Sequence, residues 1–186
     1  MQIETTPIPD LLCLTPARYG DARGFFCESW NKARMAQAGL SYDFVQDNHS
    51  LSARKGTLRG LHYQSPPHAQ AKLVRCGRGA FWDVAVDMRA GAPTYGRWYG
   101  TELSFENGRQ LMIPAGFLHG FVTLTDDVEI VYKCSDYYAP DCDGAVRWDS
   151  CGIDWPLDGD PILSEKDATA PPFGDLDSPF VYEASS

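Results

Sequence analysis

Histidine is the side chain best suited to moving protons near neutral pH, and this chain contains only four: His49, His62, His68 and His119. His62 lies within a strand-like run, TLRGLHYQ (57–64), and His119 lies in IPAGFLHGF beside a turn. His49 and His68 fall in loop-like sequence and receive no role in proton transfer. For His62 and His119 the alternative to chemistry is a packed, hydrogen-bonded imidazole in the core.

Several other kinds of chemistry lack their usual patterns. The segment Pro114–His119 fits half of the metal-binding pattern of small jelly rolls, but no H-x-H pair occurs and metal binding is not expected. No G-x-S-x-G elbow, Walker sequence or Rossmann glycine pattern is present, so no cofactor is implied. The remaining His, Tyr, Asp, Lys and Arg side chains suit proton transfer near a carbonyl group of an anionic ligand.

The elements that must position these residues are mostly strands. Strand-like runs separated by turn residues occupy 25–30, 57–64, 71–77, 80–89, 97–105, 109–114, 120–124 and 129–138. Asn107-Gly108 is the best hairpin signal, because this dipeptide suits a tight primed turn. One helix is expected near 30–38, with Ser29 or Asn31 as N-cap and Gly39 at its end. The pattern predicts an all-β fold, a β-sandwich or jelly roll with one or two short helices.

Length and composition indicate one globular domain over residues 1–186, with a loop-rich C-terminal segment at 149–186. The formal net charge of −9 argues against a nucleic-acid-binding surface. The N-terminal sequence has no signal-peptide pattern, and no window approaches the roughly 18 apolar residues of a membrane helix. Six cysteines without a C-x-x-C pair are expected to be reduced thiols, and we expect a cytoplasmic protein with no membrane partner.

Seven blocks of sequence, in order, resemble the dTDP-4-dehydrorhamnose 3,5-epimerase family. They are DARGFFCESWN, FVQDNHS, GTLRGLHYQ, QAKLVRCGRGAFWDVAVDMR, RQLMIPAGFLHGF, VYKCSDYYAP and LSEKDA. The resemblance covers nearly the whole chain. It implies a cupin-like jelly roll that needs no metal or cofactor, assembled as a homodimer that shares strands between its subunits.

The resemblance also implies roles for individual residues. His62 would be the catalytic base, Asp167 would orient it, Tyr132 would donate a proton on the opposite face of the sugar, and Lys72 would stabilise the enolate oxygen. Tyr138 matches the tyrosine that stacks on the thymine ring. The other positions that match substrate contacts are Arg23, Glu28, Gln46, Asn48, Arg59, His119, Asp143 and Lys166.

Several of these residues also have a structural interpretation. Tyr132 and Tyr138 share parity on one strand-like run and could pack in the core. Lys72 could cap a strand edge, and Asp167 could be a turn aspartate or an N-cap. The chain departs from the family pattern at Asp143, where many members carry glutamate, and at Leu118, where alanine is more usual.

The resemblance places both Arg59 and His62 at the ligand, although strand alternation sends residues three apart to opposite faces. Gly60 lies between them, and a glycine inside a strand often marks a bulge. We therefore predict a bulge or kink near Gly60, or an Arg59 that reaches a site across a dimer interface.

The expected function is epimerisation of dTDP-4-dehydro-6-deoxy-D-glucose at C3 and C5, which gives dTDP-4-dehydro-L-rhamnose. Within the enzyme class, the alternative is an epimerase specific for C3 or C5, or for another nucleotide ketosugar. Outside it, the alternatives are a metal-dependent cupin oxygenase and a non-catalytic jelly roll that binds sugar nucleotides.

Overall fold

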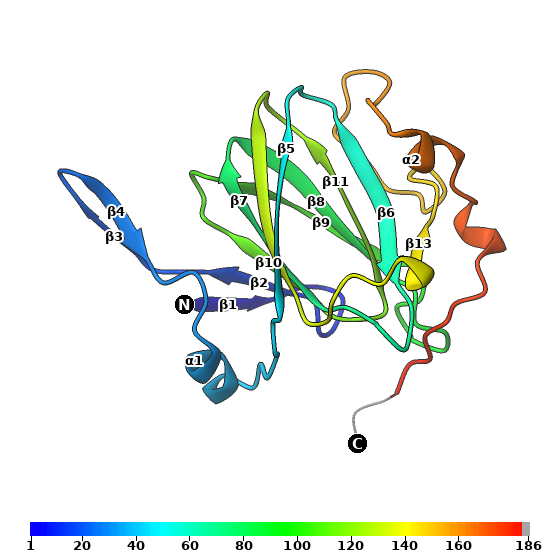
Figure 1. The fold of residues 1–186 in the computed structure, drawn as a ribbon, viewed down its shortest axis with the longest axis horizontal. Coiled ribbons are helices and arrows are strands. Elements are labelled where there is room, and N and C mark those ends of the chain that lie inside the picture. Colours follow the sequence, from blue (N-terminus) through cyan, green and yellow to red (C-terminus); the bar gives the residue numbers. More distant parts are fainter. Residues whose placement is uncertain (184–186) are drawn as a thin grey trace.

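The computed structural model describes residues 1–183, which form two facing antiparallel sheets and a projecting hairpin (Figure 1). The six-stranded sheet has the order β1 (Gln2–Thr5), β2 (Leu12–Thr15), β10 (Gln110–Ile113), β7 (Lys72–Arg78), β12 (Val128–Cys134) and β5 (Gln46–Ser52). The five-stranded sheet has the order β13 (Asp143–Ala145), β6 (Leu58–Gln64), β11 (Phe117–Thr123), β8 (Ala80–Asp87) and β9 (Trp98–Ser104). The predicted all-β fold class is confirmed.

The main core lies between the two sheets, where alternate residues of each strand point inward. Val74 and Cys76 of β7 face Phe81 and Ala85 of β8 in this cluster, and all four are buried. Burial of apolar surface here contributes about 25 cal/mol for each Å² removed from water. One-residue register changes would turn these side chains outward, so the core fixes which residues face the interior.

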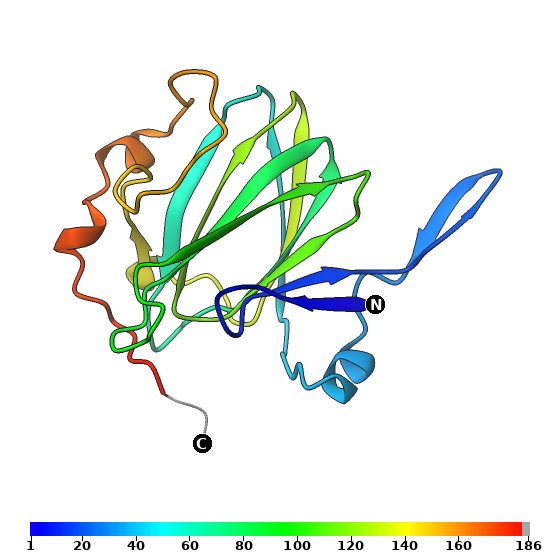
Figure 2. The same ribbon diagram turned by 180° about the vertical axis from the view of Figure 1, so that it is seen from behind.

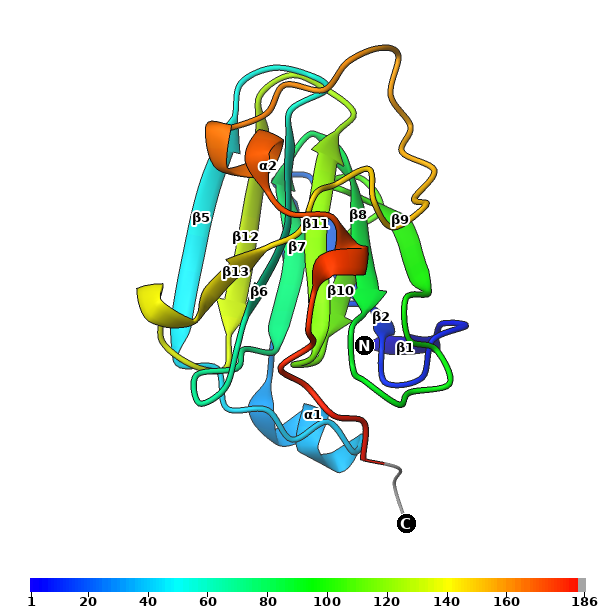
Figure 3. The same ribbon diagram turned by 90° about the vertical axis from the view of Figure 1, so that its right-hand side faces the viewer.

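The outer faces of the two sheets are covered unequally. Residues 30–44 pack on β2, β10 and β7 of the six-stranded sheet, whereas Leu51 of β5 is 55% exposed. The C-terminal segment packs on the outer face of the five-stranded sheet through Trp155, Phe173 and Phe180 (Figure 3). The outer side of β5 and β12 is therefore left uncovered by these segments.

Backbone hydrogen bonds attach the C-terminal segment to β6. Leu61 and Val146 exchange both of their backbone bonds, and the Leu58 N–H donates to the Ile162 carbonyl. The segment contains α2 (Glu165–Thr169) and, after it, the 3₁₀ turn η2 (Phe173–Asp175). A second 3₁₀ turn, η1 (Pro140–Cys142), comes before β13. This attachment brings residues of α2 to the outer edge of β6.

All eight predicted strand-like runs overlap a strand, but five strands were not expected from the sequence. They are β1, β2, β5, β13 and β3 (Arg18–Asp21), which pairs with β4 (Gly24–Cys27) in the projecting hairpin. These strands are short or polar, as QDNHSLS of β5 shows, and backbone pairing rather than apolar alternation defines them. The run predicted at 129–138 ends as a strand at Cys134, so Tyr138 lies outside it.

The hairpin predicted at Asn107-Gly108 is wrong. The strands on either side, β9 and β10, belong to different sheets, so the connection crosses from one sheet to the other. Gly108 has a positive φ of 63°, but Asn107 uses its side chain to accept the Ser104 and Arg109 N–H groups. The residues do form a turn, and it serves a crossover rather than a two-residue hairpin.

The predicted helix is present as α1 (Lys32–Gln37). Asn31 is its N-cap and accepts the Arg34 N–H at 3.1 Å, and Gly39 follows with a positive φ of 83°. No helix among residues 1–183 has the length and apolar character needed to cross a membrane.

Candidate active site

A cavity of about 370 Å³ opens between the two sheets and gathers most of the site residues expected from the sequence. His62, Lys72 and Tyr132 line it from β6, β7 and β12, respectively. The other expected residues on its wall are Gln46, Asn48, Tyr138, Asp143 and Lys166, and Tyr63, Gln64 and Gln70 complete it. Base, acid and lysine candidates thus come from three different strands around one space.

A bulge in β6 explains how Arg59 and His62 share a face. His62 pairs with His119 and Arg59 pairs with Phe121, so two residues of β6 stand opposite Gly120 alone. Gly60 has a φ of +121°, and a Cβ there would lie 2.7 Å from the Gly120 Cα, so only glycine fits. The predicted bulge near Gly60 is confirmed, and it turns Arg59 to the same side of the sheet as His62.

His62 forms a close pair with Asp167 of α2. The His62 Nε2 lies 2.6 Å from the Asp167 Oδ1, and the Asp167 side chain is almost completely buried. Because a carboxylate only accepts, Nε2–H donates to it and the Nδ1 lone pair of a neutral imidazole stays free. This is the arrangement that a general base requires.

The pKa of Asp167 lies below its usual value although burial alone would raise it. Hydrogen bonds from His62, from the Ser164 hydroxyl and from the Gly60 N–H outweigh that burial. Ser164 is also the N-cap of α2, since its Oγ accepts the Asp167 N–H at 3.2 Å and donates to Oδ2 at 2.9 Å. The helix cap and the bulge together keep Asp167 ionised beside His62.

Tyr132 and Lys72 stand on neighbouring strands of the opposite sheet, where Tyr132 pairs with Val74. Burial raises the pKa of Tyr132, with Arg59 opposing, so the phenol keeps its proton at neutral pH and can donate it. Burial lowers the pKa of Lys72, while the nearby Cys134, Asp143 and Asp83 favour its charged form. No hydrogen bond or ion pair joins the Lys72 ammonium group to another residue within 1–183.

The mouth of the cavity is held by a polar network. The Lys166 Nζ lies 2.5 Å from Asp143 Oδ2, and the Tyr138 hydroxyl donates to the same oxygen at 3.3 Å. The Tyr138 N–H donates to the Gln46 side chain at 2.9 Å. Tyr138 itself is 57% exposed, so one face of its ring is available for stacking at the entrance.

A smaller cavity of about 250 Å³ lies on the other side of His62 and is also lined by Arg59, Ser164 and Asp167. Arg59 donates to the Ser52 hydroxyl and to the Leu51 carbonyl, both at 3.3 Å. Its guanidinium group therefore lies beside β5, next to the base rather than within the larger cavity.

His119 lies behind the cavity wall, on β11 beside His62. Its Nε2 is 2.7 Å from the Oδ1 of Asp83, a fully buried residue of β8, and the His119 side chain is 10% exposed. The structure therefore brings His119 close to the site without placing it on the cavity lining.

Arg23 and Glu28 are not brought to the cavity within one chain. Arg23 sits at the tip of the hairpin β3–β4, which projects away from both sheets (Figure 2), and its side chain is 89% exposed and paired with Asp21. Glu28 lies beyond that hairpin and contacts Arg34 and Asn31. Their assignment as substrate-binding residues stays a prediction.

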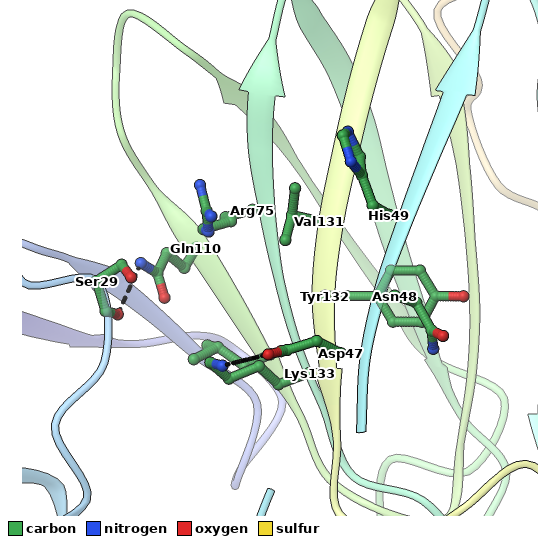
Figure 4. A pocket seen from close by; sticks show the side chains of 10 residues that line it. Ser29, Asp47, Asn48, His49, Arg75, Gln110, Val131, Tyr132 and Lys133 are labelled. Atoms are coloured by element: carbon green, nitrogen blue, oxygen red, sulfur yellow. Dashed lines mark hydrogen bonds and ion pairs between the residues drawn. The ribbon is translucent and has the colours of Figure 1, made fainter. Parts of the chain in front are cut away.

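A further cavity of about 440 Å³ lies mainly on the uncovered outer face of the six-stranded sheet. In Figure 4 the neighbours Val131 and Tyr132 point to opposite sides of β12. Arg75, Gln110 and Lys133 lie on the Val131 side, where Lys133 is 2.8 Å from Asp47. This outer groove is separated from the catalytic candidates by the sheet itself.

Five residues of this region were not identified from the sequence: Tyr63, Gln64, Gln70, Asp83 and Ser164. Gln64 and Gln70 donate to the carbonyls of Tyr137 and Asp136, which fixes the chain leading to Tyr138. A signal did exist for Ser164, because S-E-K-D fits the pattern of a capping box. Asp83 left no comparable signal, because the run FWDVAV is apolar at all of its other positions and so does not show which face of the strand is buried.

Among residues 1–183, no three His, Cys, Asp or Glu side chains are grouped so that they could hold a metal ion. The six cysteines are all unpaired thiols. The cavity itself presents imidazole, phenol, ammonium and carboxylate groups.

The sequence is similar to known enzymes over almost its full length. A family model described as dTDP-4-dehydrorhamnose 3,5-epimerase matches residues 5–175. A dTDP-4-dehydrorhamnose 3,5-epimerase from Salmonella typhimurium is 51% identical over 174 residues, which are 92% of this chain and 94% of the relative. The same enzyme from Pseudomonas aeruginosa is 50% identical and covers 95% of this chain and 98% of its own.

Solved structures agree with the sequence relatives. A dTDP-6-deoxy-D-glucose-3,5-epimerase from Legionella pneumophila in complex with dTDP-4-keto-L-rhamnose superposes with a TM-score of 0.94 at 45% identity, over 98% of this chain and 99% of its own. A 3'-monoepimerase from Streptomyces bikiniensis in complex with dTDP-quinovose gives 0.86 at 37% identity, over 91% and 86%. The chain therefore belongs to the dTDP-4-dehydrorhamnose 3,5-epimerase family and is an isomerase.

Proposed function

We propose that this protein epimerises dTDP-4-dehydro-6-deoxy-D-glucose at both C3 and C5 and releases dTDP-4-dehydro-L-rhamnose. The observation that carries the proposal is the His62–Asp167 pair, an oriented base on one wall of a cavity whose other wall holds Tyr132 and Lys72. The C4 ketone of such a sugar acidifies the protons on both neighbouring carbons. One base and one acid on opposite sides can therefore act on each carbon in turn.

Each epimerisation begins when the Nδ1 of His62 takes the proton from the carbon next to the ketone. The electron pair of that C–H bond forms the enolate, whose oxygen receives the negative charge. Lys72 stabilises this oxygen as the charge develops. Tyr132 then protonates the carbon from the other face, the ketone re-forms, and solvent returns the phenol and imidazole to their starting states.

The nucleotide end of the substrate fits the mouth of the cavity. The exposed ring of Tyr138 offers a stacking surface for thymine, and Gln46 and Asn48 supply amide groups beside it. Lys166 is a cation at this mouth that can bind the diphosphate, and Arg59, which lies beside the base and outside the larger cavity, is a second proposed contact to it. His119 remains a proposed contact that acts from behind the lining.

We propose a homodimer in which the hairpin β3–β4 of one subunit delivers Arg23 and Glu28 to the other. The hairpin projects from the two sheets (Figure 1), and although Phe25 and Arg18 contact Phe105, Tyr19 and Phe26 are left 67% and 71% exposed. A symmetric dimer that buried the outer side of β5 would give these aromatic residues a partner. The cytoplasmic location also stays a prediction.

Incubation of the ketosugar nucleotide in D₂O tests the reaction, with NMR of C3 and C5 as the readout. We expect deuterium at both carbons. Label at one carbon only would make the protein a monoepimerase, as in the Streptomyces bikiniensis relative. An absence of exchange with retained binding of dTDP would make it a binding protein.

Complementation tests the shared site. Arg23→Glu and His62→Ala should each be inactive alone, but mixed subunits should regain exchange because each heterodimer contains one intact site. If each site belongs to a single chain, mixing restores no activity. Remixing of two His62→Ala preparations serves as the control.

A further inference from the structure

Asp83 carries a buried carboxylate that the proposed reaction leaves without a role. Asp83 lies on β8 between Phe81 and Ala85, both members of the main core, and its side chain is fully buried. Its Oδ1 accepts from His119 at 2.7 Å, whereas its Oδ2 has no hydrogen-bond partner within the described chain. A buried carboxylate oxygen without a partner is costly, so its retention calls for an interaction outside these bonds.

Lys72 is the complementary group. It enters the same interior from β7 of the opposite sheet, and no residue among 1–183 forms a hydrogen bond or ion pair with its ammonium group. Asp83 and Lys72 each favour the charged form of the other across the space between the sheets. One side thus offers a free anionic oxygen, and the other offers an ammonium group with open donors.

We propose that Asp83 is a positioning residue for the reaction: fixed on one side by His119, it holds the Lys72 ammonium charged and directed at the enolate oxygen. This inference rests on the proposed function, since it assumes that Lys72 stabilises the enolate. Asp83 does not touch the substrate; it acts only through Lys72. His119 in turn anchors the carboxylate so that its second oxygen faces the lysine.

Other charged and titratable groups surround Asp83 and Lys72. Those that face Lys72 are Cys134 of β12, Asp143 of β13 and Lys166 of α2, and the cavity adds His62, Tyr63, Tyr132 and Tyr138. Those that face Asp83 are His119, Lys72 and the thiol of Cys13.

The test is the pH profile of proton exchange in Asp83→Asn, which keeps the shape and removes the charge. We expect the alkaline limb of the kcat profile to move to lower pH by about one unit, so that kcat at a given alkaline pH falls about tenfold. The affinity for dTDP should not change. Asp87→Asn is the matched control, because Asp87 is equally buried on the same strand but is bonded to Arg89 and Thr94. An Asp83→Asn profile that coincides with wild type would overturn the inference.

A stability cycle keeps the inference testable if Asp83→Asn folds poorly or if the wild type catalyses no exchange. Chemical unfolding of Asp83→Asn, Lys72→Met and the double variant measures the coupling directly. We expect Asp83→Asn to destabilise less in the Lys72→Met background than in wild type. Additive effects would overturn the Asp83–Lys72 coupling, whereas absent exchange in wild type with a positive coupling would overturn only the proposed function.

Discussion

Two of the histidine–aspartate pairs in the molecule have nearly equal length, 2.6 Å for His62–Asp167 and 2.7 Å for His119–Asp83. The two histidines are direct neighbours across β6 and β11. The His62 side chain is 32% exposed, against 10% for His119. Both oxygens of Asp167 are bonded, whereas one oxygen of Asp83 is not.

The surroundings give the two carboxylates opposite pKa changes. Hydrogen bonds from His62 and Ser164 overcome burial and lower the pKa of Asp167. Burial prevails at Asp83 and raises its pKa, although His119 and Lys72 oppose it. The same pair of residue types therefore holds a carboxylate of lowered pKa beside the proposed base at the cavity and a carboxylate of raised pKa behind it, and the environment makes the difference.

The largest expected effect is at the first pair. His62→Ala removes the base itself, so exchange at both C3 and C5 should fall by at least about a thousandfold, within the range of general acid–base catalysis. Binding of dTDP should remain, because the nucleotide contacts lie at the mouth of the cavity. Near wild-type exchange in this variant would transfer the role of base to another residue, with His119 the first alternative.

Asp167→Asn should have the next largest effect. The amide can no longer hold the Nε2–H tautomer of His62, so we expect kcat to fall by about a hundredfold with little change in KM. Steady-state kinetics on the ketosugar nucleotide provide the measurement. A rise in KM at constant kcat would instead make Asp167 a residue of substrate binding.

The opposite pKa changes predict opposite contributions to stability in acid. Asp167, with a lowered pKa, stabilises the fold above the unfolded-state value near 4, and this is lost as pH falls through its folded pKa. Asp83 has a raised pKa, so as the pH falls the folded state binds a proton there before the unfolded state does. Falling pH therefore removes the energetic cost of the buried charge. The free energy of unfolding, measured with urea from pH 7 to pH 3, should therefore decline less steeply in Asp167→Asn than in wild type. In Asp83→Asn it should decline more steeply than in wild type. Identical slopes would contradict the assignment.

The smallest expected effect concerns the helix cap that supports Asp167. Ser164→Ala removes a bond to the Asp167 N–H and one to its carboxylate, and should cost about 1 kcal/mol of stability with a modest loss of kcat. Ser164→Thr keeps the hydroxyl group and should recover both. Equal behaviour of the two variants in thermal unfolding and kinetics would exclude the cap as a support for the base.

The sequence predicted the parts of the fold that depend on local pattern. Apolar alternation identified the inner strands, Asn31 and Gly39 bounded α1, and Gly60 indicated the bulge. Prediction from local pattern failed where pairing with a strand far away in the sequence decides the structure. The polar strand β5 exists because β12 pairs with it, and Asn107-Gly108 joins two sheets rather than two paired strands.

The candidate site was predicted mainly through resemblance to a family, and the residues explain why. Nothing near His62 in the sequence indicates that its partner lies 105 positions away. Asp83 was overlooked because a single aspartate in a strand does not show whether it faces water or the core. Arg23 shows the reverse case, since the sequence assigns it to the site and a single chain leaves it in solvent.

The backbone hydrogen bonds that join β6 to Val146 and Ile162 have a consequence for synthesis of the protein. Both sheets except β13 are encoded before residue 135, so a growing chain can pair nearly all its strands and already contain His62, Lys72 and Tyr132. The imidazole has no oriented partner until residues 146–167 have been made and docked on β6. A newly made polypeptide thus acquires its shape before it acquires its oriented base, and activity should appear later in translation than the folded sheets do.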